Sequence, residues 1–393
     1  MNALKNGGQV ALLVAVVAAV LLLLGVSAIT LASTGMRSTY QQRDQVQAFY
    51  VAETGVERLL AKIRRDQTWF EGLSSGSKQI IFSQQSFAGG TIEEVTLQKI
   101  DAGAQTPGTG TEVEIISRGK FGVARKTLKV DLIISSVRGL LKGFNILPDS
   151  PVNLNVTGDF HLEGNNGAVV LNGNLDLGGA SKIEGADVYA SGTISGSVEG
   201  TTHPNYPGVP LFPRVDMEWY KKEAQKSGHY YRADQTFGGR NGVYTYDGIY
   251  FIEGNVTISG DYTGRAVIVA TGNIELPGNN KRLVAQSPPD DLLVLMTPGG
   301  YVDIENAYDQ GKNEEKGGVD ALILTRIFKA RGNATLRGCV LAREVELCGS
   351  GPGAGNVEID CQPDWVSTFD ANLLGGVLPQ MRITSWSEEY PVF

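Results

Sequence analysis

The sequence is poor in the residues that carry most metal and cofactor chemistry. Its 393 residues include 3 cysteines and 3 histidines, and no two of these lie at a metal-ligand spacing such as Cys-x-x-Cys. A Walker phosphate-binding loop is also absent. The net charge of −8 is unfavourable for binding nucleic acid. We therefore expect no cofactor, no metal and no nucleic-acid partner.

One long stretch near the start lacks charge altogether. No charged residue lies between Asn6 and Met36, and Val10 to Ala32 would form a helix about 35 Å long. That length spans a hydrocarbon core of about 30 Å, so we predict a single membrane helix. Gly25-Val26-Ser27 has the small-x-small pattern of a signal-peptide cleavage site, but the apolar run continues through Leu31. This favours a retained anchor over a removed signal peptide.

The helical pattern continues beyond the apolar run, from Arg37 to Arg65. Its apolar residues recur at spacings typical of one helix face: Val46, Phe49, Tyr50, Val56, Leu59, Leu60 and Ile63. We therefore expect one helix to run from the membrane well into solvent, with this stripe packed against the rest of the chain.

These residues resemble a known family. A short leader with Lys5 ends in Gly7-Gly8, an unbroken apolar helix follows, and residues 47–57 read Gln-Ala-Phe-Tyr-Val-Ala-Glu-Thr-Gly-Val-Glu. Over about residues 5 to 65, this combination resembles the amino-terminal region of PilX-type minor pilins. The resemblance implies cleavage by a prepilin peptidase between Gly8 and Gln9, followed by methylation of the new amino terminus. A cut between Gly7 and Gly8 is the alternative.

The chain departs from the commoner pilin pattern at one position. Major pilins carry a glutamate at the fifth mature residue, where it pairs with the terminal amine of a neighbouring subunit; here that residue is Leu13. A buried amine without a partner is costly. The resemblance therefore implies a place at the filament tip more than in its shaft, although many membrane anchors simply lack glutamate.

Residues 67–137 are predicted to form a small strand-rich unit. Residues 91–97, 111–116 and 124–132 alternate, or nearly alternate, apolar and polar side chains, and residues 119–122 provide a turn between the last two. Such strands form an antiparallel sheet with one buried face. We expect this sheet to pack on the apolar helix stripe and so form a pilin-like head.

From about residue 138 the pattern becomes a repeat. A Gly-Asn or Gly-Asp pair is followed by apolar, any and apolar residues, starting at Gly158, Gly173, Gly254, Gly272, Gly332 and Gly355. Further short apolar runs lie between these units. The glycine content, 50 residues, agrees with many tight corners. We interpret residues 138–362 as successive rungs of a parallel β-helix, since stacked rungs bury a core that no single rung can bury.

Two segments interrupt this repeat, and a third follows it. Residues 201–240 contain a proline-rich stretch and then 215–224, which has the composition of a short helix. Residues 306–318 are charged and are expected to form an excursion. Residues 363–393 contain several large apolar side chains, and we expect them to cap the last rung.

The acidic, histidine and cysteine side chains are better explained by structural roles than by catalysis or metal binding. Asp290-Asp291 and the pair Asp303/Glu305 are candidate acids or bases of a polysaccharide-cleaving β-helix, but carboxylates on solvent-facing rungs are ordinary, and we favour a solubilising role for them. His161, His203 and His229 are interpreted as solvated or core-edge residues. Among the three cysteines, Cys348 can form a disulfide with Cys361 or with Cys339, and buried thiols are an equal alternative.

The sequence thus predicts an α+β fold: a leader (1–8), a long membrane-spanning helix (9–66), a small antiparallel sheet (67–137), a β-helix with an insertion (138–362) and a cap (363–393). The expected function is that of a non-enzymatic minor pilin-like subunit of a type IV pilus or related filament. Its expected partners are other pilins, the prepilin peptidase, the inner membrane and a surface or glycan ligand. Before assembly the amino terminus would be cytoplasmic and the body periplasmic or extracellular. Two alternatives stay open: a minor pseudopilin of a type II secretion system, and a membrane-anchored β-helix enzyme acting on polysaccharide.

Overall fold

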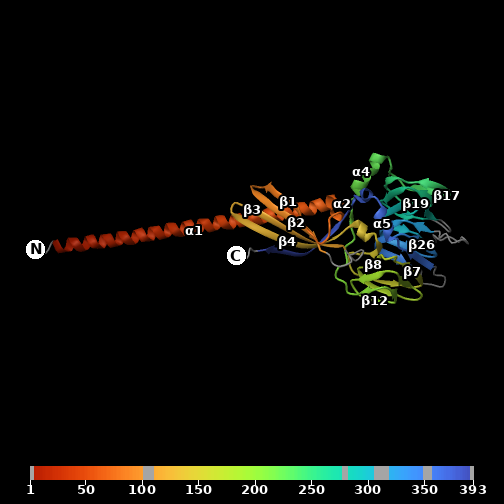
Figure 1. Ribbon diagram of the computed structural model, residues 1–393, viewed down its shortest axis with the longest axis horizontal. Helices are drawn as coiled ribbons and strands as arrows, with labels where there is room; N and C mark the ends of the chain where they lie inside the picture. Colours follow the sequence, from red (N-terminus) through yellow and green to blue (C-terminus); the bar gives the residue numbers. More distant parts are fainter. Residues whose placement is uncertain (1–3, 101–109, 277–281, 305–317, 348–355, 390–393) are drawn as a thin grey trace.

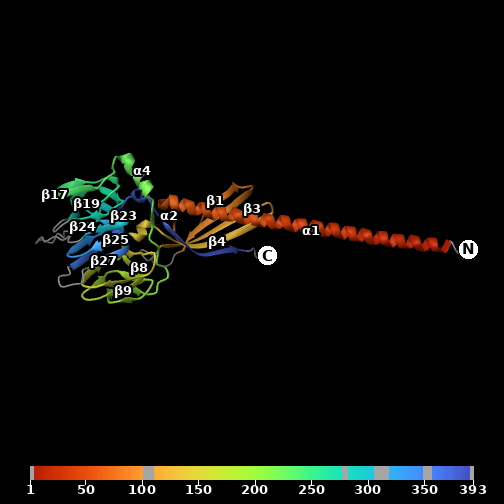
Figure 2. The same cartoon turned by 180° about the vertical axis from the view of Figure 1, so that it is seen from behind.

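The computed structural model describes residues 4–100, 110–276, 282–304, 318–347 and 356–389. Three parts follow one another along its longest direction: a bare helical rod, a small head in which a sheet packs on the same helix, and a larger β-helical body (Figures 1 and 2). The predicted fold class, a long apolar helix with a small antiparallel sheet and a parallel β-helix, is confirmed.

Helix α1 (Leu4–Arg65) has 62 residues and is about 93 Å long at 1.5 Å per residue. It ends with basic residues in its last turn, Lys62, Arg64 and Arg65, where the helix dipole favours positive charge. A short helix, α2 (Gln67–Glu71), follows at once, and the Asp66 side chain caps it by accepting the Trp69 N–H at 2.9 Å. These two helices lead the chain from the rod to the base of the body.

The head is a five-stranded antiparallel sheet in the order β1-β2-β3-β4-β30. Its strands are β1 (Lys78–Phe87), β2 (Gly90–Lys99), β3 (Thr111–Phe121), β4 (Ala124–Ser135) and β30 (Gln380–Glu389). The predicted alternation holds, because Val113, Ile115, Val130 and Leu132 are buried beneath α1. The turn between β3 and β4 lies at Gly122 and Val123, two residues later than predicted, since Gly119 and Lys120 still pair within the strands.

The last strand of the head comes from the end of the chain. Strand β30 pairs antiparallel with β4, from Gln380 opposite Ser135 to Glu389 opposite Thr127. The chain therefore returns to the head after the body is complete (Figure 1). All of residues 363–393 were predicted to form a cap on the last rung. The exposed edge of β4 instead takes up residues 380–389, because an unpaired strand edge binds another strand readily.

The body is dominated by a 20-stranded sheet, nearly closed on itself, whose strands pair in parallel throughout the described residues. The chain enters it through α3 (Val137–Leu140). The strands of the large sheet are β5 (Gly143–Ile146), β7 (Asp159–Glu163), β8 (Ala168–Leu171), β10 (Lys182–Glu184), β11 (Asp187–Ala190), β13 (Ser197–Glu199), β14 (Thr202–His203), β16 (Tyr230–Tyr231), β17 (Gln235–Thr245), β18 (Gly248–Ile252), β19 (Val256–Thr263), β20 (Arg265–Ala270), β21 (Ile274–Glu275), β22 (Leu283–Ala285), β23 (Leu292–Asp303), β24 (Val319–Asp320), β25 (Leu322–Ala330), β26 (Ala334–Arg337), β27 (Val340–Leu347) and β28 (Asn356–Asp360).

Two small sheets complete the body. One, in the order β12-β9-β6, adds a third face to the rungs formed first in the sequence. The other joins a strand before the inserted helix to a strand near the end of the chain, antiparallel. Their strands are β6 (Val152–Val156), β9 (Gly173–Leu177), β12 (Ile194–Ser195), β15 (Arg214–Val215) and β29 (Val377–Leu378).

The rungs do not stack in sequence order. Strand β5 lies between β8 and β27, and β7 lies between β10 and β28. The chain therefore enters the solenoid in its middle, winds out to β14, crosses to the opposite end at β16, and winds back until β28 meets β7. Entry and exit lie side by side, which lets the two ends of the body join neighbouring head strands.

The Gly-Asn corners of the repeat have a clear structural role. The side-chain oxygen of an asparagine accepts a backbone N–H of the next rung: Asn174 from Thr193 at 2.7 Å, Asn255 from Asn273 at 2.9 Å, and Asn333 from Asn356 at 3.0 Å. The glycine before it often has a positive φ, as at Gly173 and Gly332. The corners therefore form a ladder that satisfies backbone donors where strands end.

The segment between β14 and β16 carries the crossing. It contains helix α4 (Met217–Ser227), which Asp216 caps by accepting the Trp219 N–H at 3.0 Å and which Gly228 ends at φ +80°. Tyr220 and Ala224 bury the helix against the body. The predicted helix within 201–240 is thus present. The second predicted excursion, 306–318, lies outside the described residues except for Gly318.

After β28, helix α5 (Pro363–Thr368) and the 3-10 helix η1 (Ala371–Leu374) lie along the side of the solenoid. Their apolar residues Trp365, Val366, Phe369 and Leu374 join the body core. Backbone carbonyl groups of this segment bond α3 and β20, since the carbonyl of Phe369 accepts from Arg138 and that of Thr368 accepts from Arg265 at 2.6 Å. Helices α5 and η1 therefore cover a side of the solenoid. The last rung of the sequence, β28, is covered by β7 and not by these helices.

Candidate functional site

The amino-terminal half of α1 is exposed, and its side chains from Leu12 to Met36 are not buried by any other described part of the chain. Large apolar side chains from Leu12 to Met36 are exposed on every side of the helix, and an 18-residue window within it has a mean hydropathy of 3.0 with none of it buried. The helix is therefore long and apolar enough to cross a membrane. Figures 1 and 2 show it extending away from the head as a single rod.

Hydroxyl groups in the described part of this half bond within the helix. The hydroxyl of Ser27 donates to the Leu23 carbonyl oxygen, that of Thr30 to Val26 and that of Thr34 to Thr30, each at 2.8 Å. Such bonds to the preceding turn remove the need for water around the hydroxyls. The first charged side chains beyond the apolar stretch are Arg37 and then Arg43, which pairs with Asp44 at 3.2 Å.

The predicted processing residues, Gly8 and Gln9, lie in the first turns of α1. Their cleavage and methylation stay predictions. Leu13 is 66% exposed, so the fifth position after Gly8 presents an apolar side chain outward from the rod. Helix α1 runs without a break through Ser27, where the alternative signal-peptide cut was considered.

The other half of α1 is fixed tightly to the sheet. Ala48, Val51, Ala52, Val56, Leu59 and Ile63 are almost completely buried. Of the predicted stripe, Val46 and Tyr50 face solvent instead, at 51% and 54% exposure. The alanines take their place because small side chains allow the helix backbone to approach the sheet closely, which apolar periodicity alone does not reveal.

Glycines on both sides make this approach possible. A Cβ on Gly119 of β3 would lie 2.4 Å from the Ala52 nitrogen, and one on Gly55 of α1 would lie 2.3 Å from the Ser117 oxygen. Ser117 is buried, and its hydroxyl donates to the Ala52 carbonyl oxygen at 2.7 Å. Residues 47–57, which carry the family resemblance, therefore place Ala48, Ala52 and Gly55 at the contact between helix and head.

The three histidines serve structural contacts. His161 bonds Glu184 of the next rung at 2.6 Å. The hydrogen bond from Lys182, followed by the one with His161, lowers the pKa of Glu184. His203 stacks on Tyr189 and His229 on Tyr250, with ring centroids 4.3 and 4.1 Å apart. Among the described residues, no group of three or more His, Cys, Asp or Glu side chains is arranged to hold a metal ion.

The carboxylates considered as acids or bases are held by neighbouring groups. Asp291 accepts the backbone N–H groups of Gly264 at 2.7 Å and Ser287 at 2.9 Å, so it fixes a turn. Asp290 projects into solvent beside Arg265. Asp303 lies 3.8 Å from Arg331, and its predicted companion Glu305 lies outside the described residues.

Two of the cysteines are neighbouring buried thiols. Cys339 and Cys361 are both free. The hydrogen bond with Cys339, followed by burial, raises the pKa of the Cys361 thiol. Cys348, the shared member of both predicted disulfides, lies outside the described residues.

The sequence contains a Gly-x-Ser-x-Gly spacing, Gly72 to Gly76, which the motif prediction missed. In a nucleophile elbow the serine stands between a strand and the helix that follows it. Here the order is reversed, because the segment leaves helix α2 and enters strand β1. The match therefore lacks the structural context of a catalytic serine.

A buried polar network inside the solenoid was not predicted from the sequence. Asp320 is 1% exposed and accepts two hydrogen bonds from the Arg337 guanidinium, at 2.7 and 2.5 Å. It also accepts the Ala285 N–H, while the Tyr262 hydroxyl donates to the Asp320 carbonyl oxygen at 2.7 Å. An aspartate next to the apolar run 321–324 was the available signal. Its partner could not be found without the pairing of β24 with β26.

Comparisons with known proteins find similarity among solved structures. No family model matches the chain, and no curated protein matches it. Among solved structures, the chain is similar to the competence-associated pilin ComZ from Thermus thermophilus, with 14% sequence identity and a TM-score of 0.36. The match covers 88% of this chain and 97% of that chain.

Proposed function

We propose that this chain is a minor pilin-like structural subunit of a type IV pilus or a related filament. The observation that carries the proposal is the division of α1 into two halves. One half is apolar and exposed on every side, and the other is fixed to a small sheet by contacts at backbone distance. A helix built in this way joins a folded head to an apolar environment that other molecules must supply.

Two environments suit the exposed half at different times. Each Leu, Val or Ile side chain gains roughly 1.5–3 kcal/mol when it is removed from water, so the run from Leu12 to Met36 strongly favours burial. A bilayer provides this before assembly, and the helices of other pilins provide it within a filament. In this arrangement the amino terminus is cytoplasmic, and the head and body are periplasmic or extracellular.

The β-helical body then projects from the filament. It lies at the opposite end of the molecule from the rod, where packing of the rod into a filament leaves its surface available (Figure 1). We propose that this surface serves adhesion or contact with other minor pilins, and that it performs no covalent chemistry. His161 bonds Glu184 of the next rung and Asp291 accepts the Gly264 N–H, and these structural contacts support this proposal.

The amino-terminal mass of the chain tests the proposal. The protein is recovered from membranes of its host with and without the prepilin peptidase, and its mass is measured. We expect a mature chain that starts at methylated Gln9 and depends on the peptidase. An intact Met1, or a cut near Ser27, would overturn the pilin-like function.

Two glycine variants locate the cut. Gly8→Leu should block processing because the residue before the cut must adopt an extended backbone in the protease, which glycine does most readily. Gly7→Leu is the matched control and should leave processing intact. The opposite pattern would place the cut between Gly7 and Gly8 and leave the proposed function unchanged.

A further inference from the structure

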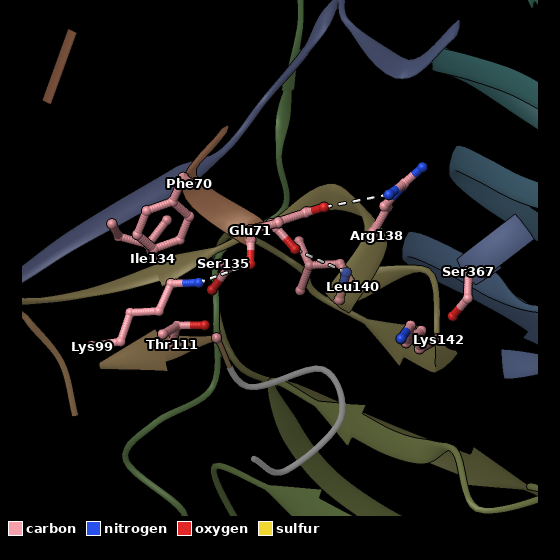
Figure 3. Close-up of a pocket in the computed structure, with 13 residues that line it drawn as sticks. Phe70, Glu71, Lys99, Thr111, Ile134, Ser135, Arg138, Leu140, Lys142 and Ser367 are labelled. Carbon is pink, nitrogen blue, oxygen red and sulfur yellow. Dashed lines mark hydrogen bonds and ion pairs between the residues drawn. The ribbon is translucent and has the colours of Figure 1, made fainter. Parts of the chain in front are cut away.

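A cavity of about 390 Å³ lies where the head meets the body (Figure 3). Its walls come from the body-facing ends of β2, β3 and β4 and from α2, α3 and α5. Three cationic side chains line it, Lys99, Arg138 and Lys142, and among the described residues Glu71 is the one carboxylate in the lining. The described lining therefore has an excess of positive charge, within a chain whose net charge is −8.

Lys99 contributes a cation that is 6% exposed. Its Nζ donates to the backbone carbonyl oxygens of Glu71 at 3.1 Å and Leu73 at 3.0 Å, and it lies 4.7 Å from the centroid of the Phe70 ring. No described carboxylate forms an ion pair with it. Burial lowers the pKa of Lys99, and the nearby charge of Glu71 opposes that shift. A second negative charge in the cavity would stabilise this ammonium group further.

Arg138 approaches Glu71 from the side opposite Lys99 (Figure 3). The distance from its Nη1 to the Glu71 Oε2 is 3.5 Å, which is long for a charged hydrogen bond. Its Nη2 donates to the Phe369 carbonyl oxygen, and its buried Nε has no partner within the described structure. The guanidinium is thus weakly paired by protein, and a planar anion is its preferred partner.

Lys142 completes the cationic lining. It is half-buried, and the described residues include no acidic partner for it. The hydroxyls of Thr111, Ser135, Ser136 and Ser367 line the same space and add neutral hydrogen-bonding groups. A cavity that combines cations with hydroxyls fits a ligand that carries both an anionic group and hydroxyl groups.

A neighbouring cavity provides an internal comparison. It has about 460 Å³ and shares Glu71 and Arg138, so this ion pair forms a wall between the two spaces. There, Arg64, Arg65 and Arg138 are matched by Asp66, Glu71 and Glu223. Its charges are balanced, whereas those of the first cavity are not.

We propose that the first cavity binds a small hydroxylated anion, a sugar acid or a sugar phosphate, with Lys142 and Arg138 contacting the anionic group. The site is built from residues of the head and the body together, so it exists only when both are folded. It requires neither filament assembly nor processing at Gly8, and it stands apart from the pilin-like function.

Calorimetric titration of the full chain in detergent micelles at low salt tests the proposal. The probes are glucuronate, glucose 6-phosphate, inorganic phosphate and glucose. We expect at least one of the two anionic sugars to bind at least about tenfold more tightly than glucose and than inorganic phosphate. Comparison of glucuronate with glucose 6-phosphate identifies the anionic group. Equal binding of glucose, or no binding of either anionic sugar, would overturn the proposal.

Three variants locate the site. Lys142→Gln should weaken binding of the preferred sugar about tenfold, whereas Lys222→Gln, which removes an exposed lysine on α4, should leave it unchanged. Glu71→Gln should strengthen binding several-fold, since it removes the competing carboxylate. Near-ultraviolet circular dichroism confirms that each variant is folded. An unchanged affinity in folded Lys142→Gln would refute this placement of the site.

Discussion

Gly119 of β3 faces Ala52 of α1 at backbone distance, so that a Cβ on the glycine would lie 2.4 Å from the Ala52 nitrogen. The Ala48 carbonyl oxygen would be 2.5 Å from the same Cβ. Both neighbours are backbone atoms of a helix and cannot move aside alone. This contact fixes how closely the head approaches the helix, and hence how the rod is joined to the rest of the molecule.

Gly119→Ala should therefore destabilise the head. An added methyl group that forces the helix away from the sheet costs about 1–3 kcal/mol. The full chain in detergent is unfolded with urea, and circular dichroism monitors the unfolding. The shift of the urea midpoint measures the loss of stability. Gly35→Ala is the control, because no atom lies within 4 Å of a Cβ built there and alanine favours a helix. A loss of stability in Gly35→Ala as large as in Gly119→Ala would contradict this explanation.

The buried Asp320–Arg337 pair should behave as one unit. Asp320→Asn leaves the guanidinium without its anion inside the solenoid and should cost about 3 kcal/mol, and Arg337→Met should cost a similar amount. The double variant should cost clearly less than the sum of the two, since neither charge is then left alone. Thermal unfolding of the body provides the measurement. Additive losses would show that the two side chains act independently.

Leu13→Glu tests the place at the filament tip that the family resemblance implies. If the missing carboxylate keeps this subunit out of the shaft, restoring it should raise the amount of the protein in sheared filaments several-fold. Leu12→Glu is the matched control, because it adds the same charge to a neighbouring exposed position of the same helix. Immunoblots of sheared filaments and of membranes measure the amount of each variant in the two fractions. An equal effect of the two variants would remove the basis of the tip assignment.

The contact between α4 and β18 should depend on pH. Lys221 bonds Glu253 at 2.6 Å, and hydrogen bonds from Lys221 and then Tyr230 lower the pKa of Glu253, while the bond to Glu253 raises that of Lys221. A lowered carboxyl pKa means that the stabilisation is present above the unfolded value near 4.5 and is lost as pH falls through the folded value. The raised pKa of Lys221 keeps this lysine charged into the alkaline range. The contact is lost as pH rises through the pKa of Lys221 in the folded protein.

Glu253→Gln should remove the acidic transition. Trp219 of α4 reports the contact, so its fluorescence in the wild type should change as pH falls below about 4.5, whereas the variant should lack that change. Lys226→Gln is the control, since Lys226 pairs with Glu223 within α4 itself and does not reach the body. The same acid transition in Glu253→Gln would assign it to other carboxylates.

Much of the local structure could be predicted from the sequence. The absence of charge between Asn6 and Met36 predicts the exposed helix, alternation predicts the head strands, and the Gly-Asn corners predict the rungs. These signals are local: a segment about 20 residues long, a period of two, and a turn that needs a flexible backbone followed by an acceptor side chain. The side-chain oxygens of Asn174, Asn255 and Asn333 accept backbone N–H groups of the next rung, which explains why that corner recurs.

The order of the rungs and the return of β30 were decided by tertiary structure alone. Rungs with the same apolar, any, apolar pattern present the same backbone ladder, so the pattern does not specify that β28 pairs with β7 or β27 with β5. Similarly, residues 380–389 alternate weakly, and only the open edge of β4 makes them a head strand. The burial of Asp320 with Arg337 and the basic cavity at Lys99 depend on these same long-range pairings. The sequence by itself determined which segments form helix, strand and corner, because those depend on neighbouring residues; which strands meet depended on the packing of the whole chain.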